Sequence, residues 1–284
     1  MTGHLQQAAD LSIPAFVVST MLAAGMSQPL ADVVAPLRRP LPVVLALLVN
    51  FAFAPLLAIV LTSVVPLQPA HATGILLLGA AAGAPFMPKL AEISLGSIAY
   101  SVALMVLLMG GSIVFMPLAL PLMIPGLSAD PWAIARPLLV VMVLPLSVGF
   151  ALGLSRAPWA ARLLSVVRTI SSATMLLLVV LMIGLNFKTL LSTLGSFAIG
   201  TYMLYLFVVI GVSYLIGAID PQTQNVFALG AGSRNIPACL VIAGSSLGDP
   251  AVTVMLIVAF VISLVGLLAL AKVMRPRAPA GVAL

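Results

Sequence analysis

Apolar runs without a charged residue occupy most of this 284-residue chain, and only short polar stretches separate them. Hydrophobic residues make up 63% of the sequence and charged residues 6%, whereas a typical soluble domain carries roughly 25% charge. Most of the runs are long enough to cross a bilayer, which takes about 20 helical residues. The sequence therefore predicts an all-α polytopic membrane protein that sits in a lipid bilayer.

We interpret the runs as nine transmembrane helices of a single domain over 1–284. The predicted spans are 11–26, 41–64, 73–94, 97–124, 133–154, 166–187, 193–218, 223–247 and 250–271.

The basic residues orient these spans. With the N-terminus outside, the cytoplasmic loops and the C-terminal tail receive eight of the twelve basic residues, and the outer side receives only Arg136 and Lys188. This asymmetry follows the positive-inside rule, so we expect a cytoplasmic C-terminus. On the same grounds Arg162, just before the span 166–187, and Arg168, at its start, are interpreted as orientation signals.

The other two cations, Lys89 and Arg234, lie inside predicted spans. Each adjoins a stretch rich in glycine and proline, residues 83–88 in the first case and 230–237 in the second. A cation in hydrocarbon is costly and usually faces a cavity or a partner. Non-helical backbone at membrane depth is tolerated where it is buried in protein or lines a cavity. The two spans 73–94 and 223–247 are therefore predicted to be broken helices that form a transport site.

An internal similarity follows the two breaks. Residues 95–102, LGSIAYSV, resemble residues 247–254, LGDPAVTV. The two copies are an odd number of predicted crossings apart, so they would have opposite orientations in the membrane. This layout is typical of inverted-repeat secondary transporters, whose two broken helices cross at the substrate site.

Three motifs resemble those of the bile acid:sodium symporter family, whose members have nine or ten spans and two crossing, unwound helices. Arg38-Arg39-Pro40 resembles the basic-proline turn after the family's second helix, so the optional first helix is expected to be absent. Asn50 with Pro55 resembles a glutamine-plus-proline pattern whose glutamine helps to bind sodium. Gly232-x-x-Asn235 is similar to the second crossing motif, E-x-G-x-Q-N. The resemblance covers nearly the whole chain.

Several sodium-binding positions of the family hold other residues here. The resemblance places the glutamate of E-x-G-x-Q-N at Gly230 and its glutamine at Arg234. In the first crossing motif, P-G-G-x-x-S-N, the serine and the asparagine fall on Met87 and Pro88, and a threonine of the next helix becomes Met105. These residues offer no side-chain oxygen to a sodium ion, and Pro88 offers only its backbone carbonyl. The resemblance thus implies that a fixed guanidinium, which is charged at any physiological pH, replaces bound sodium.

From this we predict two groups of site residues. The substrate-binding group is Arg234, Asn235, Lys89, Pro88 and Gly232, and the group for ion or proton coupling is Glu92, Asn50 and Ser101. We expect Lys89 to face the same cavity as Arg234 or, alternatively, to pair with Glu92 one helical turn away. Glu92 is the carboxylate inside a predicted span, which makes it the candidate proton carrier.

The predicted function is secondary active transport of a small organic anion across the cytoplasmic membrane of the cell. One alternative is a sodium symporter whose ligands are backbone carbonyls. Another is a membrane-embedded enzyme, but its acid–base chemistry would rest on Lys89 and Glu92 alone. The sequence holds no nucleotide-binding loop of the type G-x-x-x-x-G-K-[ST] and a single cysteine, Cys239. We expect no cofactor unless sodium binds and no nucleic-acid partner, and the sequence does not indicate an oligomeric state.

Overall fold

The computed structural model describes residues 2–27, 29, 31, 34–127, 130–154, 158–185, 187, 193, 195–221 and 223–275. Regular structure within these ranges is helical, and the one extended pairing there is an isolated antiparallel bridge between Ala82 and Arg234. The predicted all-α class is therefore confirmed.

The helices follow the predicted spans with shifted ends. They are α1 (Thr2–Ser27), η1 (Ala35–Arg38), α3 (Pro40–Leu48), η2 (Val49–Phe53), α4 (Ala54–Val64), α5 (Pro69–Ala80), α6 (Met87–Ile93), α7 (Ile98–Met123), α8 (Pro131–Leu138), η3 (Leu139–Val143), α9 (Leu144–Gly153), α10 (Pro158–Leu185), α12 (Ala198–Gly217), α13 (Gln224–Gly232), α14 (Ile236–Ile242), η4 (Ala243–Leu247) and α15 (Pro250–Val273). Two helices begin well before the predicted spans, α1 at Thr2 rather than at residue 11 and α10 at Pro158 rather than at residue 166. Arg162 therefore lies within a helix rather than beside one, and Arg168 lies well inside the helix rather than at its start.

Six helical stretches in the described ranges are long and apolar enough to cross a membrane. They are Pro40–Val64, Ile98–Met123, Pro131–Gly153, Pro158–Leu178, Ala198–Gly217 and Pro250–Val273. Shorter apolar helices lie at Pro14–Ser27, Pro69–Ala80 and Ile236–Leu247. The chain is thus a multi-pass membrane protein, and the number of nine crossings stays a prediction.

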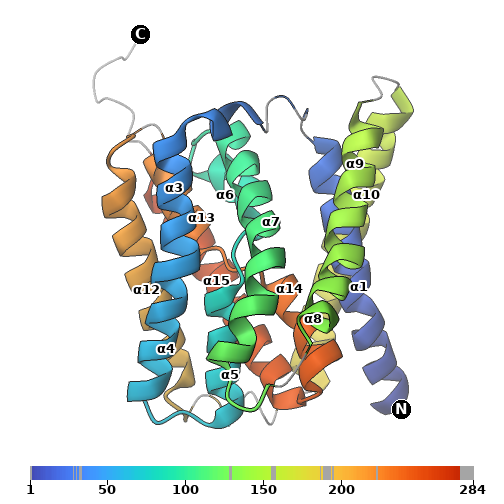
Figure 1. Cartoon of the computed structure of the whole chain (residues 1–284). Coiled ribbons are helices and arrows are strands. Elements are labelled where there is room, and N and C mark those ends of the chain that lie inside the picture. The colour runs from blue at the N-terminus through green and yellow to red at the C-terminus, as the bar shows by residue number, and fades with distance from the viewer. Residues whose placement is uncertain are drawn as a thin grey trace.

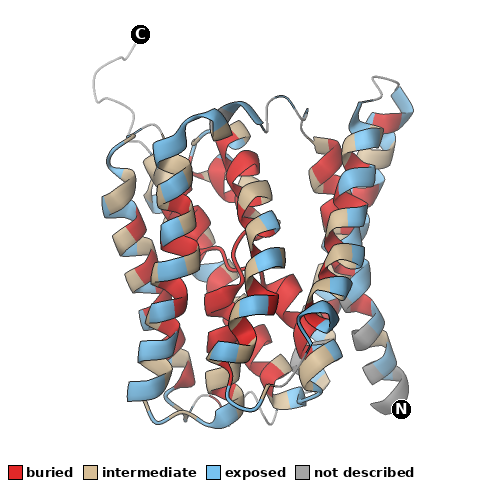
Figure 2. Ribbon diagram, in the orientation of Figure 1, coloured by how far each residue is buried: buried red, intermediate tan, exposed pale blue. Residues whose placement is uncertain are grey.

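The helices form two groups (Figure 1). Helix α1 packs along α9 and α10, and we call these helices, with α8, the side bundle. The remaining helices, α3 to α7 and α12 to α15, form the main bundle. Figure 2 shows buried residues concentrated inside the main bundle and exposed residues on its outer helices. Large apolar side chains such as Leu122, Phe207 and Leu215 are among those largely exposed, as expected where lipid replaces water.

Two of the long helices contain a π-helical turn, and each turn precedes a proline. The turn Val49–Phe53 comes before Pro55, and the turn Leu139–Val143 comes before Pro145. Proline has no backbone N–H, so the carbonyl group four residues before it loses its α-helical hydrogen bond. The turn before the proline adopts π-helical hydrogen bonding instead. In α3–α4 this rearrangement lies at Asn50, which is buried and faces the interior of the main bundle.

Helices α1 and α9 approach each other through glycine. A Cβ added at Gly25 would collide with the carbonyl oxygen of Leu146 and would lie 2.8 Å from the nitrogen of Phe150. A Cβ added at Gly149 would collide with the carbonyl oxygen of Leu22. Small residues of this kind let helix backbones pack closely where there is no water to drive association. The side bundle therefore depends on these two glycines.

We expect Gly25→Leu to lower the free energy of unfolding by about 1–3 kcal/mol, the usual range for overpacking, because backbone atoms cannot turn away as a side chain can. Thermal unfolding of the purified protein in detergent measures the effect. Gly211→Leu is the control, because no atom lies within 4 Å of a Cβ at that position. Equal melting temperatures of the two variants would contradict the expectation.

Candidate functional site at the two broken helices

The chain loses helical structure at both predicted breaks, and the two breaks contact each other. Residues 81–86 separate α5 from α6, and residues 233–235 separate α13 from α14. The backbone nitrogen of Asn235 donates to the carbonyl oxygen of Ala81 at 3.1 Å, next to the bridge between Ala82 and Arg234. Ser112 of α7 accepts from the Ala82 nitrogen at 2.8 Å and donates to the Ala82 oxygen at 2.9 Å. Backbone groups released by the breaks are thus satisfied inside the protein, as the membrane requires.

Arg234 lies at the centre of this crossing. Its residue surface is 2% exposed, and among the described residues it is the largest of the fully buried side chains. One guanidinium nitrogen, Nη2, donates to Asn50 Oδ1 at 3.0 Å and also to the carbonyl oxygen of Ala231. The guanidinium carbon lies 5.8 Å from the ring centroid of Tyr205, within the range of a cation–π interaction. Nε and Nη1 have no hydrogen-bond partner among the described residues. Arg234 is therefore a buried cation that connects three separate helical segments.

Two positions that resemble sodium ligands, Gly230 and Met87, contact each other near the second break, but apolar groups fill the space between them. A Cβ added at Gly230 would lie 2.6 Å from Met87 Cε and 3.0 Å from Leu104 Cδ2. Met87 and Met105 are both buried. The space that a glutamate side chain at position 230 would enter is thus occupied by the Met87 thioether and a leucine methyl group. A hard cation such as sodium prefers oxygen ligands, and these side chains provide none.

The other predicted crossing residues are buried as well. Asn235 caps α14, because its Oδ1 accepts from the Ala238 nitrogen at 3.1 Å, while its Nδ2 is unpaired among the described atoms. Asn50 Nδ2 donates to the Ala46 carbonyl at 2.9 Å, which directs its oxygen to Arg234. The Ser101 hydroxyl is buried without a hydrogen-bond partner in the described part of the chain. Gly232 is pressed against Ile210, whose Cγ1 would lie 2.6 Å from an added Cβ.

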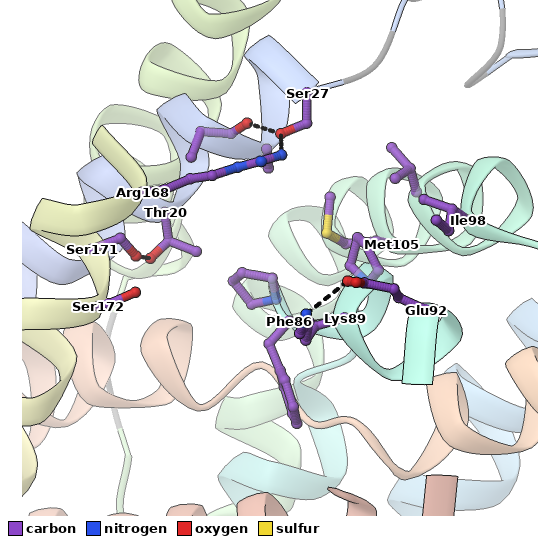
Figure 3. Close-up of a pocket in the computed structure, with 15 residues that line it drawn as sticks. Thr20, Ser27, Phe86, Lys89, Glu92, Ile98, Met105, Arg168, Ser171 and Ser172 are labelled. Atoms are coloured by element: carbon purple, nitrogen blue, oxygen red, sulfur yellow. Dashed lines mark hydrogen bonds and ion pairs between the residues drawn. The ribbon is translucent and has the colours of Figure 1, made fainter. Parts of the chain in front are cut away.

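A separate, open cavity of about 500 Å³ lies between the two bundles. Figure 3 shows its two walls, with Ser27, Arg168 and Ser171 on the side bundle and Lys89 and Glu92 on the main bundle. Lys89 Nζ bonds to Glu92 Oε2 at 2.8 Å, and the two side chains are 60% and 57% exposed. Of the two expectations for Lys89, pairing with Glu92 is confirmed. Pro88 also lines this cavity.

The structure does not bring Lys89 and Arg234 into one cavity. Lys89 lines the open cavity, whereas Arg234 is enclosed at the crossing and is not part of the cavity wall. The expectation that both cations face one space is therefore wrong for this conformation. The cavity also contains polar residues outside the predicted set, namely Arg168, Ser27, Ser171, Ser172 and Thr20. The one signal in the sequence for this wall was that Arg168 falls inside the predicted span 166–187.

The family of the chain follows from one comparison. The family model described as the sodium bile acid symporter family matches residues 14–193, which is more than half of the chain. The chain belongs to the sodium bile acid symporter family. No curated protein matches the chain. The matched residues include the first broken helix and end before the second, so Arg234 lies beyond them.

Membership in the sodium bile acid symporter family identifies the chain as a membrane transporter and not an enzyme. A sodium ion prefers oxygen ligands. At the crossing Gly230 and Met87 offer no side-chain oxygen, and the Asn50 side-chain oxygen accepts from the guanidinium of Arg234. Among the described residues, no three His, Cys, Asp or Glu side chains lie close enough together to hold a metal ion.

Proposed function

We propose that this protein is a secondary active transporter that moves a small organic anion across the cytoplasmic membrane, with the guanidinium of Arg234 in place of bound sodium. The observation that carries the proposal is the bond from Arg234 to Asn50 across the crossing of the broken helices. Both positions resemble sodium-binding glutamines of the family. A cation that is part of the chain holds the crossing together here, whatever the sodium concentration.

The electrostatics of the crossing support a permanent positive charge. Arg234 takes part in neither of the two ion pairs of the described residues, Arg39–Asp220 and Lys89–Glu92. Its charge is offset only by carbonyl oxygens and the Tyr205 ring. Charges in a protein interior are screened only weakly because the dielectric constant there is low. The charge of Arg234 therefore makes the electrostatic potential around it positive, which favours a nearby anion. A guanidinium keeps this charge at every physiological pH.

Symmetry at the crossing supports an inverted repeat. Ala82 precedes Leu95 by the same number of positions as Arg234 precedes Leu247, and Leu95 and Leu247 begin the two similar segments. Ala82 and Arg234 are the two residues that form the isolated antiparallel bridge. Equivalent residues of two repeats meet in this way when a two-fold axis passes between them. This arrangement underlies alternating access in many secondary transporters.

The distribution of charge supports the proposed orientation. Arg39 pairs with Asp220 at 3.2 Å, and Arg275 donates to the carbonyl oxygen of Ile93, so these basic residues gather at one end of the main bundle. Figure 1 shows α8, which carries Arg136, toward the opposite end. By the positive-inside rule the first end is cytoplasmic. Glu92 is paired with Lys89, which stabilises its ionised form, so proton coupling through Glu92 would require Lys89 to move away.

The test is thermal unfolding of the purified protein in sodium chloride and in potassium chloride at equal ionic strength. We expect equal melting temperatures, because the crossing already contains its cation. A ligand at 100 times its Kd stabilises the native state by about 2.7 kcal/mol, so a sodium site would be easy to detect. A saturable rise in sodium alone would overturn the proposal and favour a sodium symporter with backbone ligands.

A further inference from the structure

We propose that Arg168 is the residue that binds the anion in the open cavity, where it recognises the carboxylate of a ligand with one negative charge and an apolar body. This inference rests on the proposed function, because it assigns a binding residue to the transported anion. It concerns a wall of the side bundle, away from the two broken helices that carry the family motifs.

The depth of Arg168 in α10 distinguishes it from an orientation signal. Helix α10 begins at Pro158, and a rise of 1.5 Å per residue places Arg168 about 15 Å along the helix axis. Arg168 lies within the stretch Pro158–Leu178, which is long and apolar enough to cross the membrane. A cation at such a position is costly unless it faces a water-filled cavity or a partner. Arg162 lies nearer the helix start and is not part of the cavity wall.

The charges of the cavity wall leave Arg168 available for a ligand. Lys89 is neutralised by Glu92 at 2.8 Å, and Arg168 takes part in neither ion pair of the described residues. Its contact at the wall is a bond from Nη2 to Ser27 Oγ at 3.0 Å. Two cations and one carboxylate give the wall one net positive charge. A ligand with a single negative charge would balance it.

The rest of the wall fits a carboxylate attached to an apolar body. Thr20 Oγ1 and Ser171 Oγ lie 2.6 Å apart, on helices α1 and α10, close to Arg168 in Figure 3. A guanidinium with neighbouring hydroxyls can bind both oxygens of a carboxylate. The facing wall contributes apolar side chains, among them Phe86, Val102 and Met105. A cavity of about 500 Å³ is in the usual range for small-molecule sites.

The experiment measures binding of benzoate to the purified full chain by calorimetry and by thermal shift. Benzamide, which has the same shape without the charge, and terephthalate, which has two charges, are the comparison ligands. We expect benzoate to bind more tightly than either. We expect Arg168→Gln to weaken benzoate binding at least tenfold, and Arg168→Lys to weaken it less. Arg162→Gln is the matched control on the same helix and should bind benzoate as the wild type does.

Each outcome decides the inference. Loss of benzoate binding in Arg168→Gln, with an unchanged melting temperature in the absence of ligand, supports it. Benzoate binding that is equal in Arg168→Gln and the wild type overturns it, as does equal binding of benzamide and benzoate. Terephthalate that binds as tightly as benzoate overturns the assignment of a single charge. These results do not depend on sodium, so they are distinguishable from failure of the sodium test.

Discussion

Replacement of Gly83 by alanine is expected to disrupt the crossing of the two broken helices. Gly83 has φ +81°, and an added Cβ would lie 2.5 Å from the Met109 nitrogen and 2.9 Å from the Leu108 carbonyl carbon. The left-handed conformation costs an L-residue about 1–2 kcal/mol. The collision adds to this cost, because both neighbouring atoms belong to the backbone of α7 and cannot rotate away. We expect a loss of at least about 2 kcal/mol of stability, measured by thermal unfolding.

Gly126→Ala separates the cost of the left-handed conformation from the cost of the collision with α7. Gly126 has φ +80°, but no atom lies within 4 Å of a Cβ at that position. This control should therefore show the conformational cost alone and melt well above Gly83→Ala. If both variants lost the same stability, close packing of the first break against α7 would not be the reason why glycine is needed at position 83.

The sequence predicted the positions of the breaks well, because glycine and proline act locally on the backbone. Residues 81–86 and 233–235 lose helical structure within the two predicted spans. The side of a helix that faces a cavity was harder to predict. In a membrane helix lipid-facing and protein-facing positions are both apolar, so periodicity does not separate them. For this reason Lys89 and Arg234 were expected in one cavity, although only Lys89 lines the open one.

Contacts between distant segments explain the remaining differences. The resemblance indicated that Gly230 and Met87 lack sodium ligands, but only the fold shows that the Met87 side chain fills the space above Gly230. Arg168 was interpreted as an orientation signal, because its neighbours in sequence are ordinary for the end of a span. Its place in the cavity depends on where α10 begins and on how α1 packs against α10. Neither feature can be derived from local composition.

Replacement of Arg234 by glutamine is expected to reduce transport at least tenfold and to loosen the crossing. Glutamine is shorter and uncharged, so it cannot bond to Asn50 and to the Ala231 carbonyl together as Arg234 does. A hydrogen bond to a charged group contributes about 1.5–3 kcal/mol, and the acceptors left unpaired add a desolvation cost. Transport is measured as uptake of labelled benzenesulfonate into proteoliposomes, since this anion stays charged and does not cross the bilayer unaided.

Cys239 gives an independent readout of the same variant. It is the only cysteine of the chain, and it is fully buried in α14, close to the crossing. A maleimide can react with it only when this region opens, so the labelling rate reports local opening. We expect labelling to be about tenfold faster in Arg234→Gln, which corresponds to about 1.4 kcal/mol in the opening equilibrium, and unchanged in Arg162→Gln. Sodium should not restore slow labelling, because Gly230 and Met87 still offer no side-chain oxygen. If Arg234→Gln transported the anion normally and Cys239 stayed protected from the maleimide, the proposal that the guanidinium replaces bound sodium at the crossing would be wrong.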